Sequence, residues 1–182
     1  MNLLQAEQAK YTEAWSNPDY LKWSPAEYYE AFFLELAEPE FRRIVDLGCG
    51  QGSTTAGLTE TNIVTLVDIV DVRSDEAKEK CAFIQCPLWS RAWRGEYDIA
   101  YCCDVMEHLP TEYVMLTLDR VASYCDAAFF TISNAPDKFG GGNLHLTVRP
   151  YEWWKERLED NFDLTEARDM LAQSVFYGTS KA

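Results

Sequence analysis

Hydrophobic positions downstream of residue 43 occur in short, nearly uninterrupted runs that alternate with polar stretches of helical length. Such runs are typical of strands that are buried on both faces, as in a parallel sheet covered by helices on both sides. Five runs share this texture: residues 44–45, 63–67, 82–84, 99–103 and 127–132. The stretches between them predict helices near residues 52–60, 74–80 and 110–124.

The chain after residue 150 follows another pattern. Residues 150–159 predict one more helix, and two strand-like pieces follow at 162–167 and 173–179. Two successive strands with a short connection favour an antiparallel hairpin, which would close the edge of the sheet. The pattern therefore predicts an α/β fold with a mostly parallel sheet and helices on both of its faces.

The first 41 residues lack this alternation and are rich in aromatic side chains. Tyr28, Phe32 and Leu36 lie four positions apart, which is typical of one stripe of a helix. We expect a helical extension over residues 1–40, followed by the main domain over residues 41–182.

Composition and charge narrow the range of partners. A chain of 182 residues with 47% hydrophobic and 25% charged residues suits a single globular domain. The formal net charge of −14 is more informative, because so acidic a surface repels phosphate backbones. The lysines and arginines are scattered along the chain, which disfavours a nucleic acid as partner.

The cysteines and the N-terminal segment indicate the cellular compartment of the protein. The six cysteines form no C-x-x-C pair, and most lie in apolar runs, where cysteine behaves as a small hydrophobe. Reduced thiols are the simplest interpretation. The sequence shows no basic leader and no membrane span, so we expect a cytoplasmic protein. No feature of the sequence indicates an oligomeric state.

The strongest candidate for chemistry is the segment D-L-G-C-G-Q-G, which begins at Asp46 after the first apolar run. Gly48 and Gly50 allow a tight turn and a close approach of a ligand to bare backbone. The spacing G-x-G-x-G differs from the dinucleotide pattern G-x-G-x-x-G, since Ser53 replaces the third glycine. Asp46 suits a ligand with an ammonium or sulfonium group, which points to S-adenosylmethionine (SAM). A turn that binds no ligand is the structural alternative.

Asp68 ends the second apolar run and is a second candidate. An acid at this place can accept hydrogen bonds from both hydroxyls of a ribose. This feature does not distinguish SAM from a nicotinamide dinucleotide. A solvated aspartate at a strand end is the structural alternative, and Asp71 is a nearby competitor for the same role.

Several segments together resemble the class I SAM-dependent methyltransferases, including small members from bacteria and phages. The matching segments are VDLGCGQG, TLVD, YDIAYCCDVMEHLP with its D-x-x-E-H motif, AFFTISNAPD and LHLTVRPYEWWKERLEDNFDL. The resemblance covers residues 41–180 and implies a Rossmann-like, seven-stranded, mostly parallel sheet with helices on both faces and SAM as the cofactor. It also implies that the N-terminal extension forms a lid, with Tyr11, Trp23 and Tyr28 as candidates for lining the cleft.

The resemblance implies a set of cofactor-binding positions. They are Asp46, Gly48, Cys49, Gly50, Asp68, Ile69, Leu88, Trp89 and Cys103. The family usually has an acid after the third strand that bonds the adenine amine, and the run from Phe83 to Trp89 contains none. Leu88 and Trp89 therefore become candidates for an apolar contact with adenine.

The two histidines, His108 and His145, belong on the same side of the sheet as the glycine turn, and three interpretations stay open. One of them is a general base that takes the proton of the methyl acceptor. Alternatively, Asp104, Glu107, His108 and His145 bind a divalent metal, similar to metal-dependent methyltransferases of the ubiquinone pathway and of small-RNA ends. Finally, Glu107 and His108 form a structural corner without a catalytic role.

These features predict an enzyme that transfers a methyl group from SAM to an oxygen or nitrogen atom of a small molecule. Two alternatives belong to other functional classes: a catalytically silent SAM-binding module and a nicotinamide-dependent reductase. A third alternative is a methyltransferase that acts on RNA.

Overall fold

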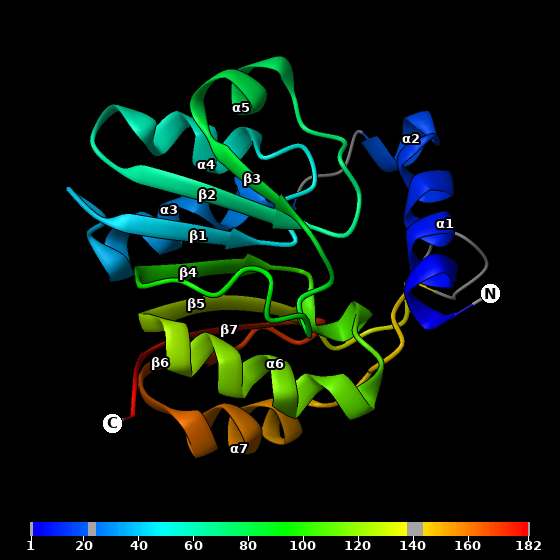
Figure 1. The fold of residues 1–182 in the computed structure, drawn as a ribbon. Helices are drawn as coiled ribbons and strands as arrows, with labels where there is room; N and C mark the ends of the chain where they lie inside the picture. The colour runs from blue at the N-terminus through cyan, green and yellow to red at the C-terminus, as the bar shows by residue number, and fades with distance from the viewer. Residues whose placement is uncertain (1, 22–24, 138–143, 182) are drawn as a thin grey trace.

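The computed structural model describes residues 2–21, 25–137 and 144–181, which fold around one seven-stranded sheet (Figure 1). The strands are β1 Arg43–Leu47, β2 Ile63–Asp68, β3 Ala82–Gln85, β4 Tyr97–Cys103, β5 Cys125–Ser133, β6 Phe162–Asp169 and β7 Gln173–Ser180. Their order across the sheet is β3-β2-β1-β4-β5-β7-β6. The five predicted apolar runs lie within β1 to β5, one run in each strand.

Strand direction confirms the predicted fold class. Strands β1 to β5 pair in parallel, whereas β7 runs antiparallel to both β5 and β6. The closing hairpin expected near the end of the chain is therefore β6 and β7. The result is a Rossmann-like α/β fold with a mostly parallel sheet.

Helices cover both faces of the sheet, as the alternation predicts (Figure 1). They are α1 Leu3–Trp15, α2 Pro18–Leu21, α3 Pro25–Ala37, α4 Ser53–Ala56, α5 Asp75–Lys80, α6 Thr111–Tyr124 and α7 Tyr151–Asn161, with 3-10 turns at Gly57–Glu60 and Met106–His108. Helices α3, α4 and α5 pack on one face, and α6 and α7 pack on the other. Each layer has its own apolar core against the sheet.

The helix predicted over residues 52–60 is shorter than expected. It consists of the single α-helical turn α4, and the 3-10 turn Gly57–Glu60 follows at once. Two β-branched residues, Thr54 and Thr55, and then Gly57 have low helix propensity, which explains why the α-helix does not continue.

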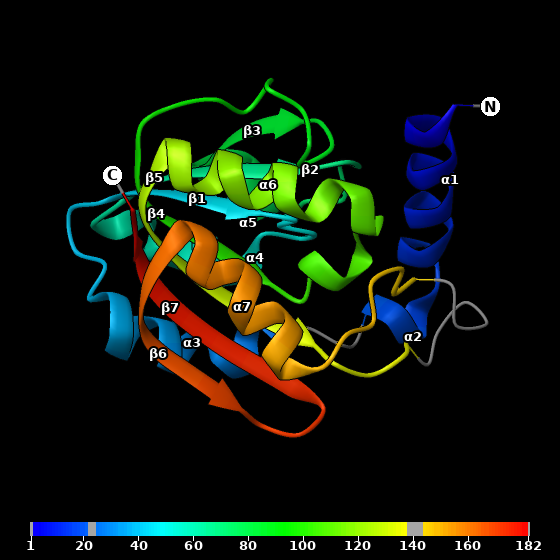
Figure 2. The same ribbon diagram turned by 90° about the horizontal axis from the view of Figure 1, so that it is seen from below.

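The N-terminal extension divides into two parts with different positions. Helix α1 stands at the carboxyl ends of the parallel strands, away from both helical layers (Figure 2). Asn2 and Gln5 form a capping box that fixes its first turn. Helix α3 instead packs against the sheet, where Phe33 is fully buried, so it belongs to the core of the fold. Helices α1 and α2 are placed to cover a site at the strand ends.

Of the residues proposed to line the cleft, Tyr28 is not found there. Tyr28 is 70% exposed on the surface of α3. Trp23 lies outside the described residues. In the part of the chain that the structure describes, no helix combines the length and the apolar character needed to cross a lipid bilayer.

We predict that Phe33→Ala lowers the free energy of unfolding by about 3–5 kcal/mol, since it leaves a cavity in the core. The Phe33 ring contacts Tyr101 and Phe129, with ring centroids 4.8 and 5.6 Å away. Phe41→Ala is the matched control, because Phe41 is 84% exposed, and it should change stability by no more than about 0.5 kcal/mol. Urea unfolding of both variants measures this, and similar losses in both would contradict the packing described.

Candidate functional site

A pocket of about 660 Å³ opens at the carboxyl ends of the strands. It lies beside β1 and β4, where the chain switches from one half of the sheet to the other, which is the usual ligand position in such folds. The pocket is lined by most of the residues singled out from the sequence: Asp46, Gly48, Cys49, Gly50, Asp68, Ile69, Leu88, Trp89, Cys103, Asp104, His108 and His145. Glu107 lies behind this wall and is fully buried.

The glycine turn after β1 has the backbone that only glycine adopts readily. Gly48 and Gly50 have φ angles of 73° and 51°, in the left-handed region. A Cβ atom on Gly48 would lie 2.5 Å from a methyl carbon of Val105, so a side chain does not fit there. The N–H groups of Gly48 and Cys49 both donate to the carbonyl oxygen of Val67, which ties the turn to β2.

Asp46 is a buried carboxylate in the wall of the pocket. Its Oδ2 accepts a hydrogen bond from the Thr55 hydroxyl at 2.6 Å. Burial raises the pKa of Asp46 from 3.8 to about 7, and the negative charge of Asp68 adds to this effect. A positively charged ligand beside Asp46 would therefore stabilise the ionised form strongly.

Asp68 joins the end of β2 to the glycine turn. Its Oδ2 accepts from the Gly50 N–H at 2.9 Å, and its Oδ1 accepts from the Val70 N–H at 3.0 Å. Burial raises the pKa of Asp68, while these backbone donors act in the opposite direction. A carboxylate offers about four acceptor positions, so Asp68 can still bind the hydroxyls of a ligand.

The acidic residues that line the pocket outnumber the basic ones. Six carboxylate residues line it: Glu7, Glu27, Asp46, Asp68, Asp104 and Asp137. Among the lining residues in the described ranges there is no lysine or arginine. The electrostatic potential of such a concave, partly buried site favours cations and disfavours phosphate groups.

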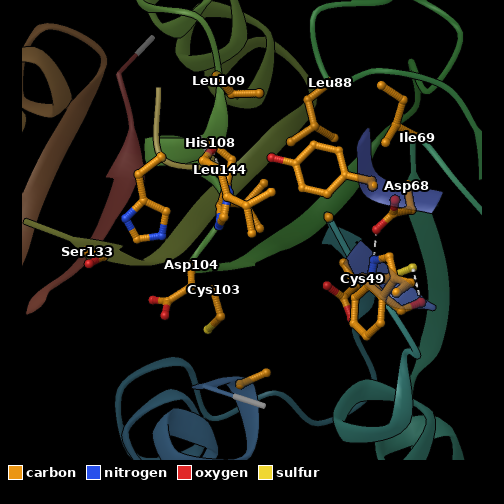
Figure 3. A pocket seen from close by; sticks show the side chains of 18 of the residues that line it. Cys49, Asp68, Ile69, Leu88, Cys103, Asp104, His108, Leu109, Ser133 and Leu144 are labelled. Atoms are coloured by element: carbon orange, nitrogen blue, oxygen red, sulfur yellow. Dashed lines mark hydrogen bonds between the residues drawn. The ribbon is translucent and has the colours of Figure 1, made fainter. Parts of the chain in front are cut away.

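The wall beyond Asp68 is apolar, as the sequence predicts. Leu88 is buried, and the Trp89 indole stacks on Tyr113 with ring centroids 4.7 Å apart. Ile69 and Leu88 lie near Asp68 at the same end of the pocket (Figure 3). A flat heterocycle could pack here without an acidic partner.

His108 lies at the opposite end of the pocket from Asp68 (Figure 3). His145 is beside it, with the two ring centroids 4.7 Å apart. His108 Nδ1 lies 3.1 Å from the carbonyl oxygen of Leu144, and His145 Nδ1 lies 2.6 Å from that of Ala135. A carbonyl oxygen can only accept, so in both rings Nδ1 carries the proton and Nε2 keeps its lone pair. Burial, together with the neighbouring His145, lowers the pKa of His108 to about 3, so His108 is neutral.

The four proposed metal ligands do not all come together. One ligand atom each from Glu107, His108 and His145 lies within 4.8 Å of the others. Asp104 is not part of this group. Its Oδ1 accepts hydrogen bonds from the Thr131 hydroxyl at 3.0 Å and from the Gln173 side chain.

The cover formed by α1 and α2 contributes pocket residues that sequence reasoning missed. Trp15 lies so close to the glycine turn that a Cβ atom on Gly50 would be 2.6 Å from its ring. Tyr20 and Glu7 also line the pocket. The proposed cleft residue Tyr11 is there as well, and its ring meets the edge of His108 at a centroid distance of 5.8 Å.

Three further residues position the site from elsewhere in the sequence. Thr55 holds Asp46, and Gln173 on β7 holds Asp104. Asp137 follows β5 and accepts from the backbone N–H groups of Leu144 and His145. Asp137 is an acid soon after a predicted strand, as Asp68 is, and this signal could have found it. Nothing in the sequence points to Gln173.

Comparison with known proteins gives one sequence relative and many structural ones. No protein-family model matches the chain. The Bacillus subtilis protein "Putative methyltransferase YqeM" is 27% identical over an alignment of 119 residues, which covers 60% of this chain. The matched stretch is only 45% of the length of that relative.

Solved structures share the fold over almost the whole chain. The 1,6-didemethyltoxoflavin-N1-methyltransferase of Burkholderia thailandensis, with bound 1,6-didemethyltoxoflavin and S-adenosylhomocysteine, has a TM-score of 0.73 at 18% identity, covering 96% of this chain and 87% of that one. The N-methyltransferase NodS of Bradyrhizobium japonicum, in complex with S-adenosylhomocysteine, has a TM-score of 0.70 at 14% identity and covers 98% and 97% of the two chains. This chain therefore has the fold of SAM-dependent methyltransferases, as the sequence predicts.

The buried charge of Asp46 leads to a prediction for the free protein. Asp46→Asn keeps an acceptor for the Thr55 hydroxyl and removes the charge, so it should raise the free energy of unfolding at pH 8. The folded wild type holds a proton that the unfolded chain releases between pH 3.8 and about 7, so its stability falls as pH rises through this window. The advantage of the variant should grow over the same window, to at most about 4 kcal/mol, and stay constant above it.

Denaturant unfolding at pH 4, 6 and 8 measures this difference. Asp160→Asn is the control, because Asp160 is an exposed carboxylate, and its effect should not grow with pH. A gain for Asp46→Asn that is equal at all three pH values would show that the carboxylate is not buried as described.

Proposed function

We propose that the protein is a SAM-dependent methyltransferase that methylates an oxygen or nitrogen atom of a small molecule. The observation that carries the proposal is the acidic pocket beside the glycine turn, which has no lysine or arginine among its described lining residues. SAM carries a sulfonium and an ammonium group, and both are cations. The names of the structural relatives support the same class, since those two proteins are methyltransferases crystallised with S-adenosylhomocysteine.

The residues of the pocket fit this cofactor. Gly48 lines the pocket, and its left-handed backbone holds the turn that borders the ligand position. Asp46 pairs with the ammonium group, and the remaining acceptor positions of Asp68 bind the ribose hydroxyls. Leu88 and Trp89 pack against the adenine ring. When bound, SAM supplies an electrophilic methyl group, and the protein contributes alignment of the acceptor with it.

The acceptor binds at the histidine end of the pocket. His108 and His145 both line this end, and an Nε2 lone pair on a neutral ring can accept a hydrogen bond from the methyl acceptor. The pocket as a whole has the size of ordinary small-molecule sites, roughly 300–1,000 Å³. Tyr11 and Trp15 of the cover are part of the lining that encloses this volume, so a small acceptor fits better than RNA.

The electrostatics disfavour the nicotinamide alternative. A dinucleotide would bring two phosphate groups to a turn flanked by Asp46 and Asp68. Each carboxylate near a phosphate opposes binding in a site of low dielectric constant. The same argument weighs against an RNA-directed enzyme, together with the net charge of −14.

We predict that Asp68→Asn weakens binding of S-adenosylhomocysteine by about 10- to 100-fold, the value of a hydrogen bond to a charged group. Asp71→Asn is the matched control. Asp71 lies three residues further along and pairs with Arg73 outside the pocket lining, so its loss should change the affinity by less than about threefold. Calorimetric titration with S-adenosylhomocysteine, and separately with NADH, measures both.

The outcomes separate the alternatives. Binding of NADH without S-adenosylhomocysteine would contradict the proposal and indicate hydride transfer. Binding of S-adenosylhomocysteine without transfer of a labelled methyl group to any of a broad panel of hydroxyl and amine acceptors would favour a silent SAM-binding module.

A further inference from the structure

We propose that Glu107, His108 and His145 bind one divalent transition-metal ion at the acceptor end of the pocket. The sequence suggested four ligands including Asp104, whereas the geometry points to these three. This inference rests on the proposed function and makes it more specific. The ion would select a hydroxyl group as the methyl acceptor.

The hydrogen bonds of the two histidines orient their rings for metal binding. Each donates its Nδ1 proton to a backbone carbonyl group, of Leu144 for His108 and of Ala135 for His145. Histidines that bind metals usually have this arrangement, because it fixes the tautomer and leaves the Nε2 lone pair for the ion. The two rings lie nearly perpendicular, with an interplanar angle of 87°.

Glu107 supplies the independent observation. Its side chain is fully buried, its Oε1 accepts from the Ser133 N–H at 2.8 Å, and its Oε2 has no hydrogen-bond partner. A buried carboxylate oxygen without a partner is costly. A metal ion beside both histidines would provide the missing interaction and the positive charge that this carboxylate lacks.

Hydrogen bonds to the backbone fix the relative positions of the three residues. The Thr147 N–H donates to the carbonyl oxygen of Glu107 at 2.8 Å, and the Thr147 hydroxyl donates to that of Leu109 at 2.7 Å. These bonds clamp the segment that carries His145 onto the turn that carries Glu107 and His108. One ligand atom of each residue lies within 4.8 Å of the others, and a filled coordination shell would bring these atoms to a spacing of roughly 3–3.5 Å.

The donor set indicates the type of ion and its use. Two imidazoles and one carboxylate suit Mn²⁺, Fe²⁺, Co²⁺ or Zn²⁺ better than Mg²⁺, which prefers oxygen ligands. Three protein ligands leave positions open, and both histidines line the pocket, so these positions face the acceptor. An acceptor hydroxyl there would lose its proton to solvent water. Its oxygen would bond to the methyl carbon as the carbon–sulfur bond breaks, giving a methyl ether and S-adenosylhomocysteine.

The test is titration of the protein with Co²⁺, followed by visible absorption and calorimetry. We expect one equivalent to bind with a dissociation constant on the order of micromolar, and Mg²⁺ to bind at least about 100-fold more weakly. Glu107→Gln and His145→Asn should each weaken Co²⁺ binding by at least about 30-fold, since each loses a ligand. Asp104→Asn, which removes a nearby charge but no ligand, should weaken it by at most about fivefold.

Several results would overturn the assignment. They are the absence of Co²⁺ binding, unchanged affinity in both Glu107→Gln and His145→Asn, or an equal loss in Asp104→Asn. An intense thiolate-to-cobalt absorption band would also overturn it, because it would assign the ion to cysteine. Catechol, used as a probe with adjacent hydroxyl groups, should alter the cobalt spectrum, and an unchanged spectrum would overturn the choice of a hydroxyl acceptor.

Titration of the same variants with S-adenosylhomocysteine separates this inference from the proposed function. Glu107→Gln should bind S-adenosylhomocysteine as the wild type does, because Glu107 does not line the pocket. Cofactor binding without Co²⁺ binding would remove the metal site and leave methyl transfer in place. Co²⁺ binding without cofactor binding would keep the metal site and remove the hydroxyl methylation built on it.

Discussion

A concentration of buried acidic groups around one pocket is the constraint on which the site depends. Asp46 and Asp68 are buried at the ends of neighbouring strands, and burial raises the pKa of both. Glu107 is buried at the other end, where burial and the charge of Asp104 raise its pKa as well. No lysine or arginine is among the described lining residues, so bound protons offset part of this charge in the free protein, and cationic ligands would take their place. A sulfonium cofactor would do so at one end, and a metal ion at the other.

The fold makes this concentration of charge possible. Parallel strands end at one edge of the sheet, so Asp46, Asp68 and Asp104 meet there although they are distant in sequence. Two helical layers and the sheet form apolar cores behind the site. Helices α1 and α2 then cover the strand ends and bring Trp15 against the glycine turn. Stability is thus concentrated in the layers, while the pocket holds groups that are costly without ligands.

The sequence predicted most of the fold, because apolar runs and their spacing directly reflect burial in a parallel sheet. It also singled out the glycine turn and both histidines, which the structure brings into one pocket, since glycine, aspartate and histidine have few roles at strand ends. It could not show that Asp104 is held by Gln173, which is 69 positions away and pairs through the tertiary fold alone. Nor could it show which of the first 40 residues cover the pocket and which belong to the core. Tyr28 and Phe33 are both aromatic, and only the tertiary structure shows that Tyr28 is exposed and Phe33 is buried.

The central claim is that Asp46 binds the cationic end of the cofactor as a carboxylate. With a pKa of about 7 in the free protein, it is about half protonated at pH 7, so binding of S-adenosylhomocysteine should release a proton. Calorimetry at pH 7 in two buffers of different ionisation enthalpy measures this release directly. The account predicts about half a proton released by the wild type and markedly less by Asp46→Asn. Binding without proton release, or equal release by both proteins, would contradict it.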